Sequence, residues 1–143
     1  MSAWVAQSGA RAFSKRVVVS SDDIDMLGHA SNISFVRWIQ DVAMEHSRAM
    51  GLGLAEYQGI GAVFVVRRHE VDYLRPARLG EEIELRTWVG LTRAASCERH
   101  TEIARVTEGE ILAEAVTTWA FVDAQTGRPT RIPPDVRARF GVL

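Results

Sequence analysis

Acidic and polar residues that could do chemistry lie together in the stretch Asp22-Asp23-Ile24-Asp25-Met26-Leu27-Gly28-His29-Ala30-Ser31-Asn32. Its carboxylates can act as a nucleophile or as a base that activates water. Ser31 or Asn32 is a natural N-cap for a following helix, because these side chains accept hydrogen bonds from first-turn amides. A helix start has unpaired N–H groups and the positive end of the dipole. Both suit an anion, or a carbonyl oxygen that becomes negative in a transition state.

Each residue of this stretch also has a structural interpretation. Asp22 and Asp23 are of a type that more often forms turns by bonding its own backbone. Gly28 fits a position that needs positive φ or close approach of a substrate. A lone histidine beside a helix start, here His29, is as often structural as catalytic. Asp25 is also compatible with a turn, but its position relative to Gly28 and the helix start favours a catalytic role.

The elements that must position this stretch are a strand before it and a helix after it. The pattern predicts a strand over Phe13 to Ser20 and a helix from Asn32 to about Met50, without internal Gly or Pro. One face of the helix is expected to pack on a sheet. That stripe consists of Phe35, Ile39, Val42, Ala43, His46 and Met50.

The rest of the chain reads mostly as strand. Strands are predicted over Ala62–Arg75, Glu82–Val89, Ala95–Val106 and Ile111–Asp123, the last three joined by short turns as an antiparallel meander. Pro133-Pro134 is expected to start a short terminal helix over Asp135–Phe140. The sequence therefore predicts an α+β fold with one long central helix wrapped by an antiparallel sheet of five or six strands.

Composition limits the domain count and the partners. A chain of 143 residues with 47% hydrophobic content is expected to form a single domain over residues 1–143, with a loose lead-in over 1–11 and a C-terminal tail over 133–143. A net charge of -1 and a pI near 6.4 argue against nucleic acid as a partner. The single Cys97 excludes an internal disulfide and lacks the spacing of a metal site. Without a signal-peptide core or a stretch of about 18 apolar residues, we expect a cytoplasmic protein with no membrane span.

The strand over residues 111–123 is apolar on both faces. Ile111, Ala113, Ala115, Trp119 and Phe121 share one face, and Leu112, Val116, Ala120 and Val122 share the other. A sheet with one wet face should instead alternate with polar residues. Because the chain has only one long helix to cover the sheet, we expect a homo-oligomer, either a dimer or a dimer of dimers.

The chain resembles the hotdog-fold thioesterases of the 4-hydroxybenzoyl-CoA thioesterase type over roughly Phe13 to Asp123. The family's loop motif is matched at Asp23, Asp25, Gly28, His29, Asn32 and Phe35. The segments Val71-Asp72-Tyr73-Leu74-Arg75-Pro76-Ala77 and Gly80-Glu81-Glu82-Ile83 resemble the family's Arg-Pro turn and the opening of its next strand. The chain has Phe35 where Tyr is common in the family, and Ala43 where many members carry Arg.

The resemblance implies a hydrolase that cleaves acyl-CoA, or an acyl carrier protein thioester, to acid and thiol. It makes Asp25 the catalytic carboxylate, as nucleophile or general base, and His29 a second catalytic candidate. Gly28, Asn32 and Ile33 would provide backbone groups for the oxyanion. Arg93, in the turn before a strand, would bind the nucleotide end of coenzyme A. No cofactor is implied beyond the coenzyme A of the substrate.

Two other function classes stay open. A hotdog dehydratase or hydratase would need a His and acid pair at the α and β carbons of the acyl chain, and His29 is available, although the motif spacing fits a thioesterase better. A non-catalytic acyl-CoA binding module is the other class, because one fold can host different sites. An assay of thiol release across acyl thioesters separates these classes.

Overall fold

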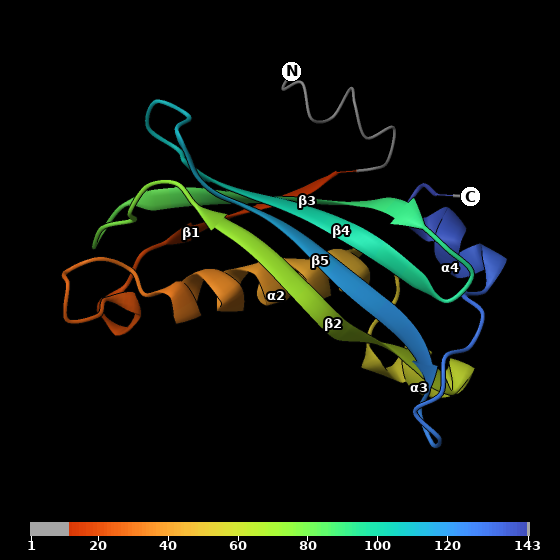
Figure 1. Ribbon diagram of the computed structural model, residues 1–143. Helices are drawn as coiled ribbons and strands as arrows, with labels where there is room; N and C mark the ends of the chain where they lie inside the picture. Colours follow the sequence, from red (N-terminus) through yellow and green to blue (C-terminus); the bar gives the residue numbers. More distant parts are fainter. Residues whose placement is uncertain (1–11, 143) are drawn as a thin grey trace.

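The structure, a computed structural model, describes residues 12–142 (Figure 1). A single long helix lies against one face of a curved antiparallel sheet. The elements in chain order are β1 (Phe13–Val18), the 3-10 turn η1 (Ser21–Asp23), α2 (Asn32–Ala49), α3 (Leu54–Ile60), β2 (Ala62–Tyr73), β3 (Glu82–Thr92), β4 (Ser96–Arg105), β5 (Ile111–Asp123) and α4 (Pro134–Arg139).

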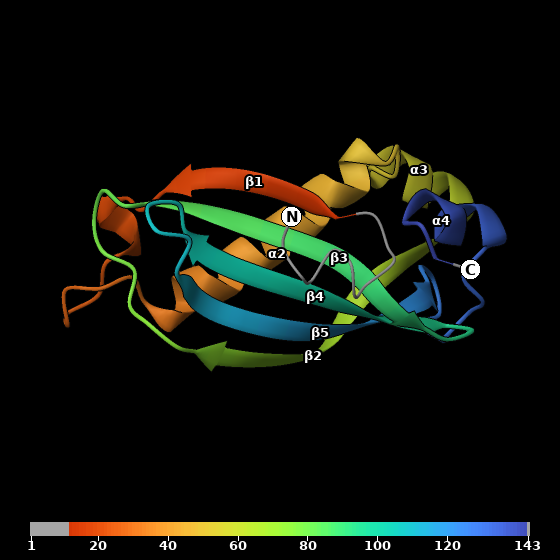
Figure 2. The same ribbon diagram turned by 90° about the horizontal axis from the view of Figure 1, so that it is seen from above.

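The sheet has five strands in the order β1-β3-β4-β5-β2, and every neighbouring pair is antiparallel. The consecutive strands β3, β4 and β5 form the predicted meander, while β1 and β2 are the edges. Viewed from above, α2 crosses beneath the sheet from the η1 end toward α3 and α4 (Figure 2). The predicted hotdog arrangement of a sheet around a central helix is therefore confirmed, with five strands.

The α2 helix starts as the sequence predicts. Ser31 is its N-cap, and the Ser31 side chain accepts a hydrogen bond from the N–H of Ser34 at 3.1 Å. Five of the six stripe residues are buried, and Met50, the sixth, is half-buried just after the helix. The stripe anchors α2 to the sheet through burial of apolar area.

The core has two parts along α2. The first surrounds the N-terminal half of the helix and includes Phe35, Trp38, Ile39, Ile83, Leu85, Ile103 and Leu112. The second closes the other end of the sheet and includes Leu52, Val89, Cys97, Phe121, Val136 and Phe140. The second part uses α4, so the residues expected to be a C-terminal tail contribute to the core.

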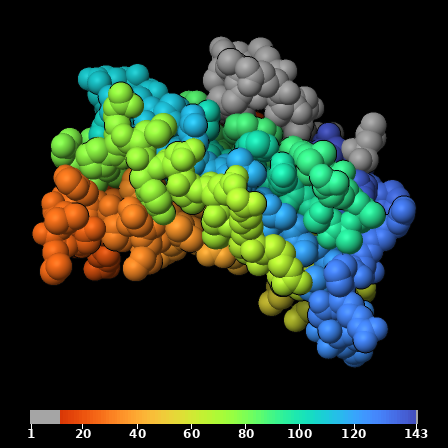
Figure 3. All heavy atoms as spheres, viewed as in Figure 1, coloured from red at the N-terminus to blue at the C-terminus, as the bar shows by residue number. Residues whose placement is uncertain are grey.

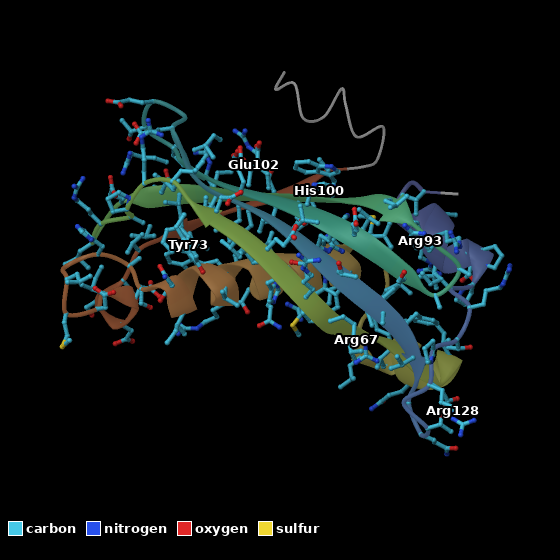
Figure 4. All side chains as sticks on the ribbon, in the orientation of Figure 1. Arg67, Tyr73, Arg93, His100, Glu102 and Arg128 are labelled. Carbon is cyan, nitrogen blue, oxygen red and sulfur yellow. The ribbon has the colours of Figure 1, made fainter. Side chains whose placement is uncertain are left out.

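The sequence missed one element and misjudged one surface. Residues 54–60 form α3, for which no helix was predicted. The outer face of the sheet is not uniformly apolar, because Arg86, Glu102 and Glu114 oppose one another across β3, β4 and β5. His100 and Glu102 point away from α2 on this face (Figure 4). Burial raises the pKa of Glu102, and the neighbouring Glu114 acts in the same direction, whereas Arg86 opposes both.

No helix among residues 12–142 is long and apolar enough to cross a membrane. The expected lead-in over residues 1–11 lies outside the described part of the chain.

Candidate active site

The acidic stretch folds into a small closed loop that leads into α2. Ile24 and Ala30 form an isolated antiparallel bridge. Within it, the N–H of Asp25 donates to the carbonyl of His29 at 2.9 Å, and the N–H of Gly28 donates to the carbonyl of Asp25 at 3.1 Å. These bonds fix the backbone of the loop directly before the helix start.

The two candidate carboxylates of the loop have opposite environments. Asp23 is 7% exposed. It accepts hydrogen bonds from the Ser20 N–H at 2.9 Å and the Ser34 hydroxyl at 3.1 Å, and Arg37 lies 3.6 Å away. Asp25 is exposed, and its Oδ1 accepts one bond, from the N–H of Leu27 at 2.9 Å. Asp23 therefore holds the loop to the helix, while the Asp25 carboxylate is available to a substrate.

The first amides of α2 are available as donors. Within residues 12–142, the N–H groups of Asn32 and Ile33 have no acceptor, because the Ser31 cap bonds the N–H of Ser34. Two free donors at the start of an 18-residue helix form a site for a developing negative charge. Gly28 differs, since its N–H is already bonded and its φ of 84° is the left-handed conformation that glycine adopts without strain.

His29 is half-buried beside this loop. Its backbone carbonyl accepts the bond from Asp25, so its main chain fixes the loop. Its imidazole has no hydrogen-bond partner among the described residues, which leaves the ring nitrogens available. The loop thus places Asp25, Gly28 and His29 shortly before Asn32 and Ile33, the first residues of α2.

Two hollows follow α2 away from the loop. The first, of about 480 Å³, is lined by Asn32, Ile33, Val36, Arg37, Gln40 and Tyr73. The second, of about 490 Å³, begins at Gln40 and extends between the C-terminal half of α2, α3, β2 and α4. Figure 3 shows α2 and β2 side by side on this surface, with α3 at the far end. Gln40 lines both hollows, so they adjoin at this residue of α2.

The second hollow contains a buried cation that the sequence did not single out. Arg99 on β4 is 5% exposed. Its Nη1 contacts Nδ1 of His46 at 2.9 Å and donates to the Thr87 hydroxyl at 3.1 Å, and its guanidinium lies 5.6 Å from the centre of the Phe140 ring. Burial, aided by Arg99, lowers the pKa of His46 to about 3, so His46 is neutral and accepts this bond. Burial lowers the pKa of Arg99 to about 10, which leaves it cationic at neutral pH.

Arg93 lies apart from the loop. It is exposed in the turn between β3 and β4, where its N–H donates to the Ser96 carbonyl at 2.8 Å. Figure 4 places Arg93 beside α4, whereas the loop before α2 is at the opposite end of the molecule. One chain therefore does not bring Arg93 to Asp25.

Cys97 is not part of the loop. Cys97 is buried in the second part of the core, and burial raises the pKa of its thiol to about 11, so the reactive thiolate is scarce at neutral pH. No cluster of three His, Cys, Asp or Glu side chains that could hold a metal ion occurs within the described residues.

Known proteins of similar sequence include acyl carrier protein thioesterases. A palmitoyl-acyl carrier protein thioesterase from Gossypium hirsutum is 29% identical over 137 residues, covering 90% of this chain and 32% of that protein. A dodecanoyl-acyl carrier protein hydrolase from Cinnamomum camphora is 24% identical over 136 residues, covering 90% of this chain and 35% of that protein. The chain thus spans about a third of the length of these relatives.

Solved structures share the fold. A 1,4-dihydroxy-2-naphthoyl-CoA thioesterase from Synechocystis superposes with a TM-score of 0.83 at 16% identity, covering 91% of this chain and 96% of that chain. A 12:0-ACP thioesterase from Umbellularia californica gives a TM-score of 0.80 at 21% identity, covering 92% of this chain and 51% of that chain. Residues 10–140 match the family described as the acyl-ACP thioesterase N-terminal domain. The chain, with its carboxylate loop at the start of a sheet-wrapped helix, therefore belongs to the acyl-ACP thioesterase family.

Proposed function

We propose that this protein hydrolyses an acyl thioester of coenzyme A or acyl carrier protein, with Asp25 as its catalytic carboxylate. The observation that carries the proposal is the exposed Asp25 side chain on a loop that leads into the unpaired amides of Asn32 and Ile33. Membership of the acyl-ACP thioesterase family supports the same reaction.

Asp25 has two possible roles in this reaction. Its carboxylate either attacks the thioester carbonyl carbon or takes a proton from an attacking water. In both routes the carbonyl oxygen becomes negative, the carbon–sulfur bond breaks, and the thiolate leaves and takes up a proton. In the first route water then hydrolyses the anhydride formed with Asp25, which frees the acid and restores the carboxylate. The N–H groups of Asn32 and Ile33 are the proposed oxyanion donors, and Gly28 serves the loop conformation. The imidazole of His29 is the proposed second polar contact to the substrate.

The two hollows along α2 are the proposed acyl site. A volume of about 490 Å³ for the second hollow lies within the range of small-molecule pockets, and most of its lining side chains are apolar. The first hollow reaches the proposed oxyanion donors, because Asn32 lines it. A thioester carbonyl at the start of α2 would therefore direct its acyl chain along the helix toward Arg99.

A homo-oligomer is proposed to complete the site. Met26, Leu27 and Ile33 are exposed by 102%, 80% and 73%, an apolar group around the loop that a partner surface would cover. The 12-residue β2 is an edge strand, and two copies can pair antiparallel about a two-fold axis. Such pairing reverses one protomer, so the partner's β3–β4 turn, with its Arg93, would lie at the end that holds the Asp25 loop.

Oligomeric state is measured by light scattering at micromolar concentration. A dimer or a dimer of dimers is expected. A stable and active species at the chain mass of 15.9 kDa would contradict the proposal.

The reaction is tested by thiol release from aromatic, short, medium and long acyl-CoA esters and from the matching acyl carrier protein esters. Asp25→Asn keeps the size of the side chain and removes its charge, so turnover is expected to fall by at least about 10²-fold. Folding of the variant is checked by circular dichroism. Wild-type turnover in Asp25→Asn would exclude this carboxylate, and tight ester binding without any thiol release would favour a binding module.

A further inference from the structure

The cavity at the C-terminal half of α2 has an unusual charge balance. Most of its lining is apolar, including Ala43, Leu52, Val89, Trp119, Val136 and Phe140. Its charged lining residues are Arg48, Arg99 and Arg137, and no Asp or Glu lines it in the described part of the chain. An apolar cavity with cationic and no anionic side chains is suited to a ligand that is itself partly apolar and partly anionic.

Among residues 12–142, Arg99 has no counter-ion. Both acceptors of its Nη1, the ring of His46 and the hydroxyl of Thr87, are neutral groups. Its Nε and Nη2 have no acceptor within residues 12–142, and no carboxylate lies within ion-pair distance of it there. Buried charges in proteins are normally paired, because an unpaired one loses its hydration without compensation. The guanidinium therefore presents a free two-nitrogen edge and an uncompensated charge.

We propose that this cavity binds the far end of an acyl chain that carries a terminal carboxylate, and that the Nε and Nη2 edge of Arg99 binds this carboxylate. A guanidinium edge matches the two oxygens of a carboxylate in a bidentate pair. This inference rests on the proposed function, since it names the substrate class of the same site as the ω-carboxyacyl thioesters.

The spacing along α2 suits such a substrate. From Asn32, at the proposed oxyanion amides, to Ala43 and Ser47 in the cavity, the helix rises roughly 17 to 22 Å at 1.5 Å per residue. An acyl chain of medium to long length covers this path when extended. The two hollows adjoin at Gln40, so the proposed acyl path follows α2 from one hollow to the next.

A methyl-terminated chain fits this cavity less well. It would displace water from the guanidinium and leave Nε and Nη2 of Arg99 without an acceptor among residues 12–142. Trp119, which lines the same cavity, adds a second donor, because its buried Nε1 has no acceptor among the described residues. Both side chains therefore favour an acyl chain that ends in an oxygen atom able to accept hydrogen bonds.

The kinetic test compares two CoA esters of equal chain length, one ending in a carboxylate and one in a methyl group. Wild type is expected to hydrolyse the carboxylate ester with a kcat/KM at least about tenfold higher. Arg99→Met, an apolar side chain of similar length, is expected to reverse this preference, and Arg99→Lys, which keeps the charge but loses the fork, to retain part of it. Arg128→Met, a change of the same type in an exposed turn, is the matched control and should keep the wild-type ratio.

Equilibrium binding separates failure of this inference from failure of the proposed hydrolysis. A long-chain carboxylate and the alkanol of the same length are titrated into wild type and Arg99→Lys by calorimetry. Wild type is expected to bind the carboxylate at least about tenfold more tightly, and the variant to lose most of that advantage. This result would support the anion site even if no ester were hydrolysed. Equal affinity for the two ligands, or a wild-type preference for the methyl-terminated ester that Arg99→Met leaves unchanged, would overturn the proposal.

Discussion

The two ends of α2 carry ionisable groups in opposite environments. At its N-terminal end Asp25 is exposed on a loop, beside amides without acceptors. Toward its C-terminal end Arg99 and His46 are 5% and 0% exposed and contact each other. The first region offers reactive groups that a single chain leaves open to water, whereas the second is enclosed by the same chain.

This difference separates the two requirements of a site for a long substrate. Chemistry needs groups that a substrate can reach, and their surroundings are completed when a partner surface or the substrate itself excludes water. Recognition of a chain end needs a cavity that exists before binding, because a preformed pocket loses less conformational entropy. Such a cavity lowers the stability of the fold, because it keeps Arg99 buried without a counter-ion among residues 12–142.

The largest effect on stability is expected from Asp23 at the active-site end. Asp23→Asn removes one charged acceptor from a buried side chain that bonds Ser20 and Ser34, so the free energy of unfolding should fall by about 1–3 kcal/mol. Asp25→Asn, exposed and with one local bond, should change it by less than about 0.5 kcal/mol while abolishing most turnover. Urea unfolding and thiol release of the two variants measure this contrast. If Asp23→Asn lost turnover with unchanged stability, the two acids would have exchanged roles.

A pH effect of about 2 kcal/mol is expected at the buried end. Burial lowers the pKa of His46 from 6.5 to about 3, so below pH 6.5 the unfolded chain takes up a proton that the folded chain does not. This contribution to stability is complete above pH 6.5 and is lost as the pH falls toward 3. The loss is at most about 1.4 kcal/mol per pH unit, or about 2 kcal/mol at pH 5.

His46→Gln isolates this effect, because its amide oxygen can still accept from Arg99 but does not titrate. The free energy of unfolding of wild type and variant is measured by urea titration between pH 7.5 and pH 4.5. As the pH is lowered to 5, the free energy of unfolding of wild type should fall by about 2 kcal/mol more than that of the variant. Parallel curves would show that His46 is protonated equally in the folded and unfolded chains. Burial would then not lower its pKa, and the C-terminal end of α2 would not differ from the exposed loop in this respect.

The loop at the N-terminal end of α2 could be predicted from the sequence. The buried Arg99 near its C-terminal end could not. Asp25, Gly28, His29 and Asn32 are adjacent in the chain, so their types and spacing alone define a loop before a helix. The burial of Arg99 depends on which face of β4 meets α2. That strand reads Cys97-Glu98-Arg99-His100-Thr101-Glu102, with polar residues on both faces, so periodicity alone does not assign its inner face.

Two other features, α3 and the outer face of β5, also depend on information that the local sequence pattern lacks. The short α3 lacks the length that makes a helical pattern clear. It is joined to α2 by a half-buried hydrogen bond of 2.8 Å between Tyr57 and Ser47. The outer face of β5 looked apolar because Val116 and Ala120 were considered within one strand. Its charged neighbours Arg86 and Glu102 come from β3 and β4, and only strand register places them on that face.

The smallest effect is expected from substitution of Arg93. It tests whether the β3–β4 turn of one protomer lies beside the Asp25 loop of its partner. In a two-fold dimer the partner's Arg93 would contact the phosphate-bearing end of coenzyme A bound near Asp25. A contact made equally in the ground state and the transition state changes binding alone, so Arg93→Ala should raise KM up to about tenfold and leave kcat unchanged. Added salt should shrink the effect, because the contact is exposed.

Arg93→Ala is compared with Arg128→Ala, an exposed turn arginine with no proposed role, on CoA esters and on N-acetylcysteamine esters of the same acyl chain (Figure 4). The truncated esters lack the phosphates, so their hydrolysis should be indifferent to both substitutions. Equal damage to the truncated and the full ester would assign Arg93 to the scaffold, since no phosphate contact is lost with the short ester. An effect confined to the CoA ester would support a phosphate contact by Arg93 of the partner protomer, because the β3–β4 turn and the loop before α2 lie at opposite ends of one chain.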